Sequence, residues 1–357
     1  MSARLLWLCS LLIACNDATG KQPEPKPVAK VDPPPAVAAN DAIKKDAKEK
    51  DGKKGDQQDS EWVPAEFKNG AARWKDTGVY VDGKPIGFLT FGELPIALKP
   101  TWVKDKVSQN KPADCPKCPA WKWSQQRFYK FTDYLKAIGV DVRKVKEIHV
   151  YGPRLSQTVV ATGKDLQSKR ADGFMFRFGG DVGGKALPWV PEGFGNGKTP
   201  DKIAGVMIYI QRKPPKVTRD GIELDGQPVY GVPYYGDPIR GGVRVYLDDK
   251  LAAIIKRNDL DPKIATKSGS GDLSWSFSAF LKGKGVDTSK VVEGWVIRDE
   301  KREERIPWAD LEKLSFAASS QAKGGVMLGD KRAGAIALHT RAIKADELPK
   351  ILPDEQW

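Results

Sequence analysis

Apolar and polar residues alternate along two stretches that lie far apart in the chain. Val79 to Phe91 alternates around Asp82-Gly83, and Val243 to Ile255 alternates around Asp248-Asp249. A period of two is typical of half-buried strands, and a short polar pair between two such runs indicates a hairpin turn. The pattern therefore predicts one β-hairpin in each stretch.

A short helix is expected after the first hairpin. Tyr134, Leu135 and Ile138 share one helical face, Thr132 stands where an N-cap belongs, and Gly139 stands where a helix stops. Valine and isoleucine positions from 145 to 150 then predict a strand.

The sequence of this helix and strand returns later in the chain. Residues 131–150 and 277–296 are identical at ten positions without a gap, and Ser278 and Gly285 repeat the expected cap and stop. Self-similarity over this length predicts two copies of one structural unit.

Two further blocks repeat in the same order. Residues 79–84 match 245–250, and residues 201–205 match 330–334. The apolar runs that begin in the last pair of blocks predict a buried strand that closes each copy.

The distance between matching blocks shrinks along the chain, from 166 to 146 to 129 residues. The first copy therefore carries extra residues within 96–127 and within 173–200. Insertions in repeats map to surface loops, which carry function more often than shared cores do. An alternative start pairs residues 82–85 with 225–228, but it needs gaps.

These blocks predict an α+β fold of two tandem homologous domains, the first over residues 61–215 and the second over 216–357. Each is expected to hold a hairpin, a short helix and a mixed or antiparallel sheet. The 357 residues suit two domains of ordinary size, and no apolar run approaches the ~20 residues that a membrane-spanning helix needs.

The first fifteen residues have the pattern of an export signal. A short apolar run, Leu5 to Ala14, follows Arg4 and ends Leu12-Ile13-Ala14-Cys15. This ending resembles the lipobox of bacterial lipoprotein signals. The resemblance implies a signal peptide over 1–14, cleavage before Cys15 and lipidation of Cys15. A plain secretory signal with a chance cysteine is the alternative.

Residues 15–60 are expected to form a disordered tether behind the lipid. They contain no aromatic residue and are rich in proline, lysine and aspartate, so they cannot bury enough apolar area to fold. Asn16, which follows Cys15 in place of aspartate, favours by analogy an outer-membrane location, facing the periplasm or the cell surface. We expect a bacterial cell-envelope protein.

Charge separates the two copies. The chain carries a net charge of +13, of which residues 61–215 contribute +11 and residues 216–357 contribute +1. Copies of one fold should share a charge if charge served only solubility, so the first domain is expected to contact an anionic partner. A basic solvated face with no partner is the alternative.

The candidate partners at the envelope are acidic lipid, acidic glycan or an envelope protein, and nucleic acid would be adventitious there. The basic residues expected to make the contact are Lys104, Lys106, Lys111, Lys117, Lys122, Arg143, Lys144, Lys146 and Arg154.

The first insertion also holds a cysteine pair and a tryptophan cluster. Cys115 and Cys118 predict a local disulfide, with a redox pair or half of a metal site as alternatives. Trp102, Trp121 and Trp123 can stack on sugars or bases, or pin a long loop to the body, and pinning is favoured.

No catalytic motif is present, and no catalytic residue, metal or cofactor is expected. His149 aligns with Trp295 in the second copy, which favours a packing position.

The repeated run with Tyr134-Leu135 and Gly139-Val140 before a valine-rich strand is similar to the core of the sulfite-oxidase-like molybdopterin-binding domains. That resemblance hints at the fold. It argues against molybdenum chemistry, since no cysteine follows Cys118 to serve as the ligand.

The sequence thus favours an exported lipoprotein with a non-catalytic binding, adaptor or assembly role. An envelope enzyme or a thiol redox protein that uses the Cys115/Cys118 insertion is the alternative.

Overall fold

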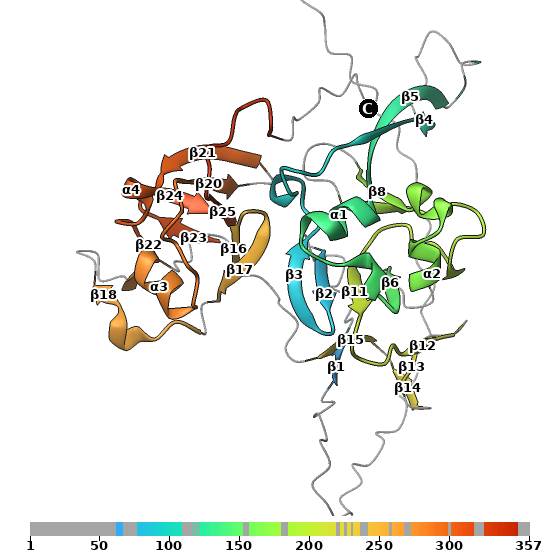
Figure 1. Cartoon of the computed structure of the whole chain (residues 1–357), viewed down its shortest axis with the longest axis horizontal. Helices are drawn as coiled ribbons and strands as arrows, with labels where there is room; N and C mark the ends of the chain where they lie inside the picture. Colours follow the sequence, from blue (N-terminus) through green and yellow to red (C-terminus); the bar gives the residue numbers. More distant parts are fainter. Residues whose placement is uncertain are drawn as a thin grey trace, which may run out of the picture. The chain divides into compact units, whose positions relative to one another are not determined.

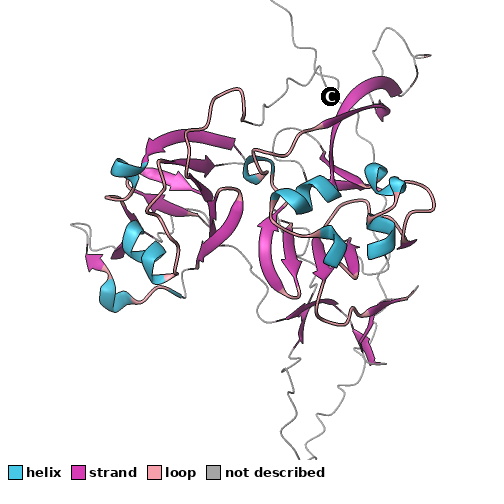
Figure 2. Ribbon diagram, in the orientation of Figure 1, coloured by secondary structure: helices cyan, strands magenta, loops and turns pink. Residues whose placement is uncertain are grey.

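The computed structural model describes residues 62–66, 77–108, 117, 119, 121–152, 157–179, 185–218, 222–224, 227–229, 231–235, 242–256, 259–267, 273–298, 301–317 and 325–348. The predictions for Cys15, the tether, Lys111, the Cys115/Cys118 pair and Arg154 lie outside these residues. Figures 1 and 2 show the elements, which are mixed β-sheets and four short α-helices in the described part of the chain.

The first copy is built on a six-stranded sheet in the order β10-β7-β6-β11-β2-β3. The hairpin is formed as predicted, and β11 lies parallel to β2 but antiparallel to β6. The strands are β2 (Gly78–Val81), β3 (Lys84–Phe88), β6 (Glu147–Tyr151), β7 (Thr158–Thr162), β10 (Asn196–Gly197) and β11 (Gly205–Tyr209).

The second copy is built on a five-stranded sheet in the order β17-β16-β25-β20-β21. Here β25 lies parallel to β16 and antiparallel to β20, so the five strands follow the same order as β3, β2, β11, β6 and β7 in the first sheet. The strands are β16 (Val243–Leu247), β17 (Lys250–Ile255), β20 (Glu293–Arg298), β21 (Lys301–Pro307) and β25 (Ala335–His339).

Individual hydrogen bonds repeat between the two sheets. The Asp82 amide donates to the Ile208 carbonyl over 2.9 Å, and the Asp248 amide donates to the Leu338 carbonyl over 3.0 Å. Both hairpins also have a register shift at the same place, after Val79 in one and after Val245 in the other. The sequence alignment of the hairpins is confirmed.

The alignment of the last block is wrong by one residue. The Ala204 amide donates to Tyr151 and the Gly334 amide to Ile297, so Ala204 corresponds to Gly334 rather than to Ala333. The identical residues of this block lie before the strands or at their first residue. The pairing with β6 and β20, not this identity, sets the register of β11 and β25.

The two predicted helices are present, and each begins earlier than expected. They are α1 (Phe131–Ala137) and α3 (Phe277–Gly283). Ser276 caps α3 through its hydroxyl, so Thr132 and Ser278 lie inside the helices instead of capping them. The cause is tertiary, because the buried Phe131 and Phe277 already belong to the first turn and each amide bonds a carbonyl of a neighbouring segment. Gly139 and Gly285 end the helices at φ values of +89° and +73°, as predicted.

A second sheet lies beside each helix. In the first copy it has the order β4-β5-β8-β9, and in the second β18-β19-β22-β23-β24. The strands are β4 (Thr101–Ser108), β5 (Trp121–Lys130), β8 (Met175–Phe178), β9 (Ala186–Trp189), β18 (Thr266–Lys267), β19 (Leu273–Ser276), β22 (Ser315–Ala317), β23 (Val326–Leu328) and β24 (Lys331–Ala333).

The first insertion, residues 96–127, contains paired strands where a surface loop was expected. β4 and β5 pair over eight residues each, whereas β18 and β19 pair over two. The extra length extends this hairpin in the first copy.

The remaining elements are small. A separate pair joins β1 (Trp62–Glu66) to β15 (Gly231–Tyr235), and a third sheet holds three short strands. These strands are β12 (Lys216–Val217), β13 (Ile222–Leu224) and β14 (Gln227–Val229), and the two one-turn helices are α2 (Gly163–Leu166) and α4 (Trp308–Leu311).

Each copy has its own apolar core between helix and sheet. Phe131, Leu135 and Ile148 are fully buried in the first core, as are Phe277 and Leu281 in the second. The described residues from 62 onward nevertheless belong to one compact unit. The coarse prediction of mixed sheets with few short helices is confirmed.

Candidate functional surfaces

The β4–β5 hairpin presents tryptophan side chains to solvent. Trp102, Trp121 and Trp123 are 48%, 39% and 53% exposed, so the expectation that they pin a loop to the body is wrong. The register pairs Lys106 with Trp123, and residues opposite one another in an antiparallel pair share a face of the ribbon. The backbone of β5 pairs with β8 only at Tyr129 and Lys130, so the outer part of the hairpin extends past that sheet (Figure 1).

Lysines stand among these rings. The Lys106 ammonium lies 4.3 Å from the centre of the Trp121 ring and 5.3 Å from that of Trp123. The Lys104 ammonium lies 5.6 Å from the Trp123 ring. The two tryptophans meet edge to face, with ring centres 5.8 Å apart. We call Trp102, Lys104, Lys106, Trp121 and Trp123 the tryptophan–lysine face.

The opposite side of the hairpin faces the body. Phe128 is fully buried and packs on Trp189, with ring centres 5.1 Å apart. The Arg177 guanidinium lies 5.8 Å from the Phe128 ring centre, and its burial lowers the pKa of Arg177 below the ordinary arginine value. These contacts fix the base of the hairpin and leave the tryptophan–lysine face outward.

The other predicted basic residues that the structure describes lie elsewhere or are already engaged. Lys117 is exposed in the segment between the strands, and Lys122 lies on β5. Arg143 and Lys144 lie on the short 3₁₀ turn Val142–Lys144, where Arg143 donates to Asp141 over 3.0 Å. Lys146 donates to the Gln211 carbonyl over 2.7 Å. The structure therefore brings Lys104 and Lys106 together but not the whole predicted set.

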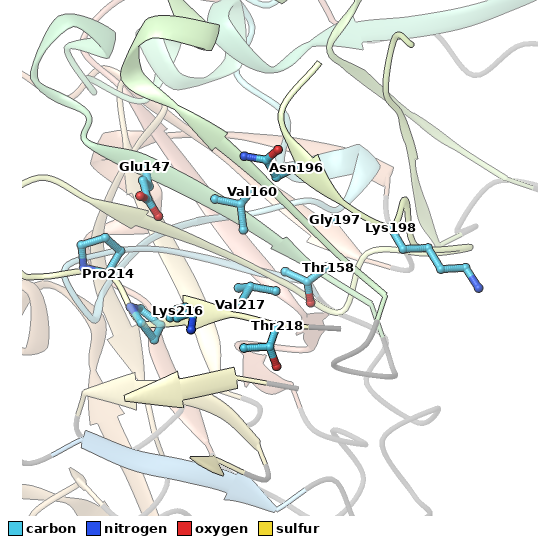
Figure 3. Close-up of a pocket in the computed structure, with 11 residues that line it drawn as sticks. Glu147, Thr158, Val160, Asn196, Gly197, Lys198, Pro214, Lys216, Val217 and Thr218 are labelled. Carbon is cyan, nitrogen blue, oxygen red and sulfur yellow. The ribbon is translucent and has the colours of Figure 1, made fainter. Parts of the chain in front are cut away.

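A pocket of about 810 Å³ opens on the other face of the first large sheet, away from α1. Glu147 and Val160 line it from the sheet, and Pro214 and Lys216 line it from the chain that follows β11 (Figure 3). The described lining residues are Glu147, Thr158, Val160, Asn196, Gly197, Lys198, Pro214, Pro215, Lys216, Val217 and Thr218.

His149 supports the wall of this pocket. The imidazole is fully buried, with Nε2 2.8 Å from the Glu147 carboxylate and Nδ1 2.9 Å from the Tyr151 hydroxyl. Burial lowers the pKa of His149, although Glu147 opposes the shift. Because an ionised carboxylate only accepts, the neutral ring donates from Nε2 and accepts the Tyr151 proton at Nδ1.

The second copy repeats this arrangement with a different ring. The Trp295 indole N–H donates to Glu293 over 3.0 Å, as His149 does to Glu147. The prediction that His149 occupies a packing position is consistent with this equivalence.

A buried polar network joins the two copies. Glu93, on the 3₁₀ turn Phe91–Glu93 of the first copy, accepts from the guanidinium of Arg244 and from the Tyr246 hydroxyl. The side chains of Glu93 and Arg244 are 2% and 7% exposed. Sequence reasoning missed this pair. The available signal was a charged residue inside the apolar run Val243–Leu247, at the position where the first copy has Gly78.

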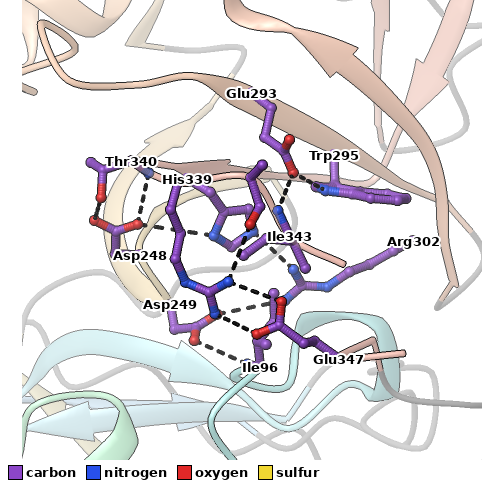
Figure 4. Close-up of polar contacts among 12 residues, drawn as sticks. Ile96, Asp248, Asp249, Glu293, Trp295, Arg302, His339, Thr340, Ile343 and Glu347 are labelled. Atoms are coloured by element: carbon purple, nitrogen blue, oxygen red, sulfur yellow. Dashed lines mark hydrogen bonds and ion pairs between the residues drawn. The ribbon is translucent and has the colours of Figure 1, made fainter. Parts of the chain in front are cut away.

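Arg302 completes the network (Figure 4). It donates to the carbonyls of Gly92 and Leu94 over 3.1 and 3.0 Å, and its guanidinium lies 3.1 Å from His339 Nε2. Burial, reinforced by the Arg302 charge, lowers the pKa of His339 to about 4. Asp249 accepts from the Ile96 amide over 3.0 Å. The other Asp249 oxygen, Oδ1, makes no hydrogen bond and lies 3.7 Å from Arg302 Nη2. The remaining contacts are made within the protein, so this network has the character of a structural junction.

Within the described residues, no group of three or more histidine, cysteine, aspartate or glutamate side chains is placed to hold a metal ion. The helices in the described part of the chain are all too short or too polar to cross a bilayer. The Cys115–Cys118 disulfide stays a prediction.

Comparison with known proteins found no matching family model, no matching curated protein and no matching solved structure.

Proposed function

We propose that the chain is an exported, lipid-anchored protein of the bacterial envelope with a binding or adaptor role, made of two tandem homologous domains. The anchoring rests on the apolar run that ends at Cys15. The shared origin of the domains is supported by ten identities and by the same strand order in both large sheets.

The tryptophan–lysine face carries the proposal that the first domain contacts an anionic partner. Lysine ammonium groups beside aromatic rings place positive groups at the surface, while the rings offer apolar contact area. Exposed aromatic residues beside cations are typical of binding surfaces, because one group supplies contact area and the other supplies electrostatic attraction.

Charge reversal of this face tests the function. In the chain from Asn16 onward, which lacks the lipidated residue, we expect Lys104→Glu with Lys106→Glu to weaken binding to heparin and to anionic phosphatidylglycerol vesicles at least tenfold. Binding by the unmodified chain should weaken with salt.

The second copy offers a matched control. Lys282 and Lys284 are exposed, and Lys284 lies 5.7 Å from the centre of the Phe280 ring. Lys282→Glu with Lys284→Glu makes the same change of net charge and should alter binding less than twofold. Equal losses in the two double variants would refute a specific surface, and no binding by the unmodified chain would refute the proposed function.

A further inference from the structure

We propose that the pocket over β6 and β7 binds a guanidinium group through the carboxylate of Glu147. The inference goes beyond the proposed envelope function and uses a different surface of the first copy. It rests on a comparison of the two copies at one equivalent carboxylate.

In the second copy, the carboxylate at this position has a cationic partner. Glu293 is 1% exposed, and its Oε2 lies 2.5 Å from Nη2 of Arg305. Its Oε1 accepts from Trp295 and from the Ile343 amide, each over 3.0 Å. An arginine, an indole N–H and an amide N–H thus stabilise one buried charge.

In the first copy, the equivalent arginine is missing. Trp295 pairs with Arg305 across β20 and β21, and His149 pairs with Val160 across β6 and β7. Val160 therefore occupies the place of Arg305. The His149 bond to Glu147 is kept, and the pocket opens over Val160 and Glu147.

The chain that covers this part of the sheet also differs between the copies. The Ile343 amide donates to Glu293. By the strand register its counterpart in the first copy is Lys213, and the next two residues, Pro214 and Pro215, line the pocket and have no amide N–H to give. His149 is neutral, so it donates a hydrogen bond without cancelling the Glu147 charge. The site keeps the carboxylate and its ring donor and leaves space for the cation.

Two lysines border the pocket, but neither occupies the position beside the carboxylate that Arg305 has in the second copy. Lys216 lies 3.4 Å from the carboxylate of Glu223, and Figure 3 shows Lys198 pointing away from Glu147. A guanidinium suits the site better than an ammonium, because its planar N–H groups can bond both carboxylate oxygens, as an arginine fork does. The volume of about 810 Å³ leaves room for the rest of a small ligand or for the arginine of a short peptide.

Titration calorimetry on the full chain in detergent tests the inference. The probes are arginine amide, the tripeptide Gly-Arg-Gly, and citrulline amide, which has nearly the same shape without the charge. We expect saturable binding of at least one arginine probe and at least tenfold weaker binding of citrulline amide. Preference for the tripeptide would point to a peptide source, and preference for arginine amide to a free guanidino compound.

Two variants test the site, one by removing the charge of Glu147 and one by filling the space beside it. Glu147→Gln keeps an oxygen to accept the His149 N–H and should weaken arginine binding at least tenfold. Val160→Arg rebuilds the pair seen in the second copy and should block the site. Glu192→Gln, at an exposed carboxylate of the first copy outside the pocket, should leave binding unchanged.

Each failure has a distinct meaning. No saturable binding of either arginine probe, equal binding of citrulline amide, or full binding by Glu147→Gln would overturn the guanidinium site. Heparin binding through the tryptophan–lysine face would survive all three results. Because Glu147→Gln is nearly isosteric, its result decides the matter even if Val160→Arg fails to fold.

Discussion

At the residue scale, the two histidines of the chain are both buried and both held neutral. His149 is fully buried, and His339 is 2% exposed beside the Arg302 guanidinium. Each is more costly to protonate in the folded protein than in the unfolded chain, where a histidine has a pKa of ~6.5. Acid is therefore expected to act on this protein through histidine before it acts through most carboxylates.

The pH dependence of stability tests this expectation. As the pH falls below about 6.5, the histidines of the unfolded chain become protonated while those of the native chain stay neutral. The histidines therefore make their full contribution to the free energy of unfolding above that pH. It should fall as the pH drops toward about 4, the pKa of His339, by up to about 1.4 kcal/mol per pH unit for each histidine. Urea unfolding between pH 7 and 5 measures the slope. His339→Gln, which still offers Arg302 an acceptor, should reduce that slope by about half, and an unchanged slope would contradict the assignment.

At the scale of elements, one aspartate in each hairpin turn ties the hairpin to the end of the closing strand. Asp82 has a φ of +47° and accepts from the amides of Ile210, Gln211 and Arg212 over 2.9–3.1 Å. Asp248 has a φ of +45° and accepts from the Thr340 amide over 2.9 Å. An aspartate at this turn position thus does two things: it tolerates a left-handed backbone, and its carboxylate accepts hydrogen bonds from the end of the closing strand.

Asp82→Ala should destabilise the protein by about 1–3 kcal/mol, since three amides lose their acceptor and alanine is strained at positive φ. Asp82→Asn keeps a side-chain oxygen and tolerates the same backbone, so it should recover at least half of the loss. Chemical denaturation of the two variants measures the difference. Equal destabilisation by alanine and asparagine would show that the hydrogen bonds do not matter.

At the scale of the whole molecule, the buried pair of Glu93 and Arg244 couples the two copies. Removing one partner of a buried ion pair leaves the other charge without compensation, which costs about 3–5 kcal/mol. Glu93→Ala is therefore expected to lower the free energy of unfolding by that amount. Asp172→Ala, which removes an exposed partner of Lys130, should cost less than about 1 kcal/mol.

Hydrogen exchange distinguishes coupling from a local effect. In Glu93→Ala, amides of β11 and of β25 should both lose protection, because the junction holds the copies in one cooperative unit. Loss confined to the first copy would show that the two cores unfold independently.

Much of the local structure was predictable from the sequence. The hairpins at Asp82 and Asp248, the helices that end at Gly139 and Gly285, and the buried closing strands follow from periodicity and turn chemistry. The helix starts were misplaced, because the buried Phe131 and Phe277 already belong to the first turn, so each helix begins one residue before the expected cap. The last repeat block was misaligned by one residue, because strand pairing rather than local identity sets the register.

The sequence by itself determined the export signal pattern, the repeat, the unequal charge of the two copies and the alternation within each hairpin, because these depend on neighbouring residues. Only the tertiary structure decided which basic residues meet, that Trp121 and Trp123 face solvent, and that Glu93 reaches Arg244. It also decided that Glu147 opens into a pocket while Glu293 is sealed by Arg305. These facts depend on contacts between strands that are distant in the sequence. The local pattern of one strand does not indicate which residues of another segment lie opposite it.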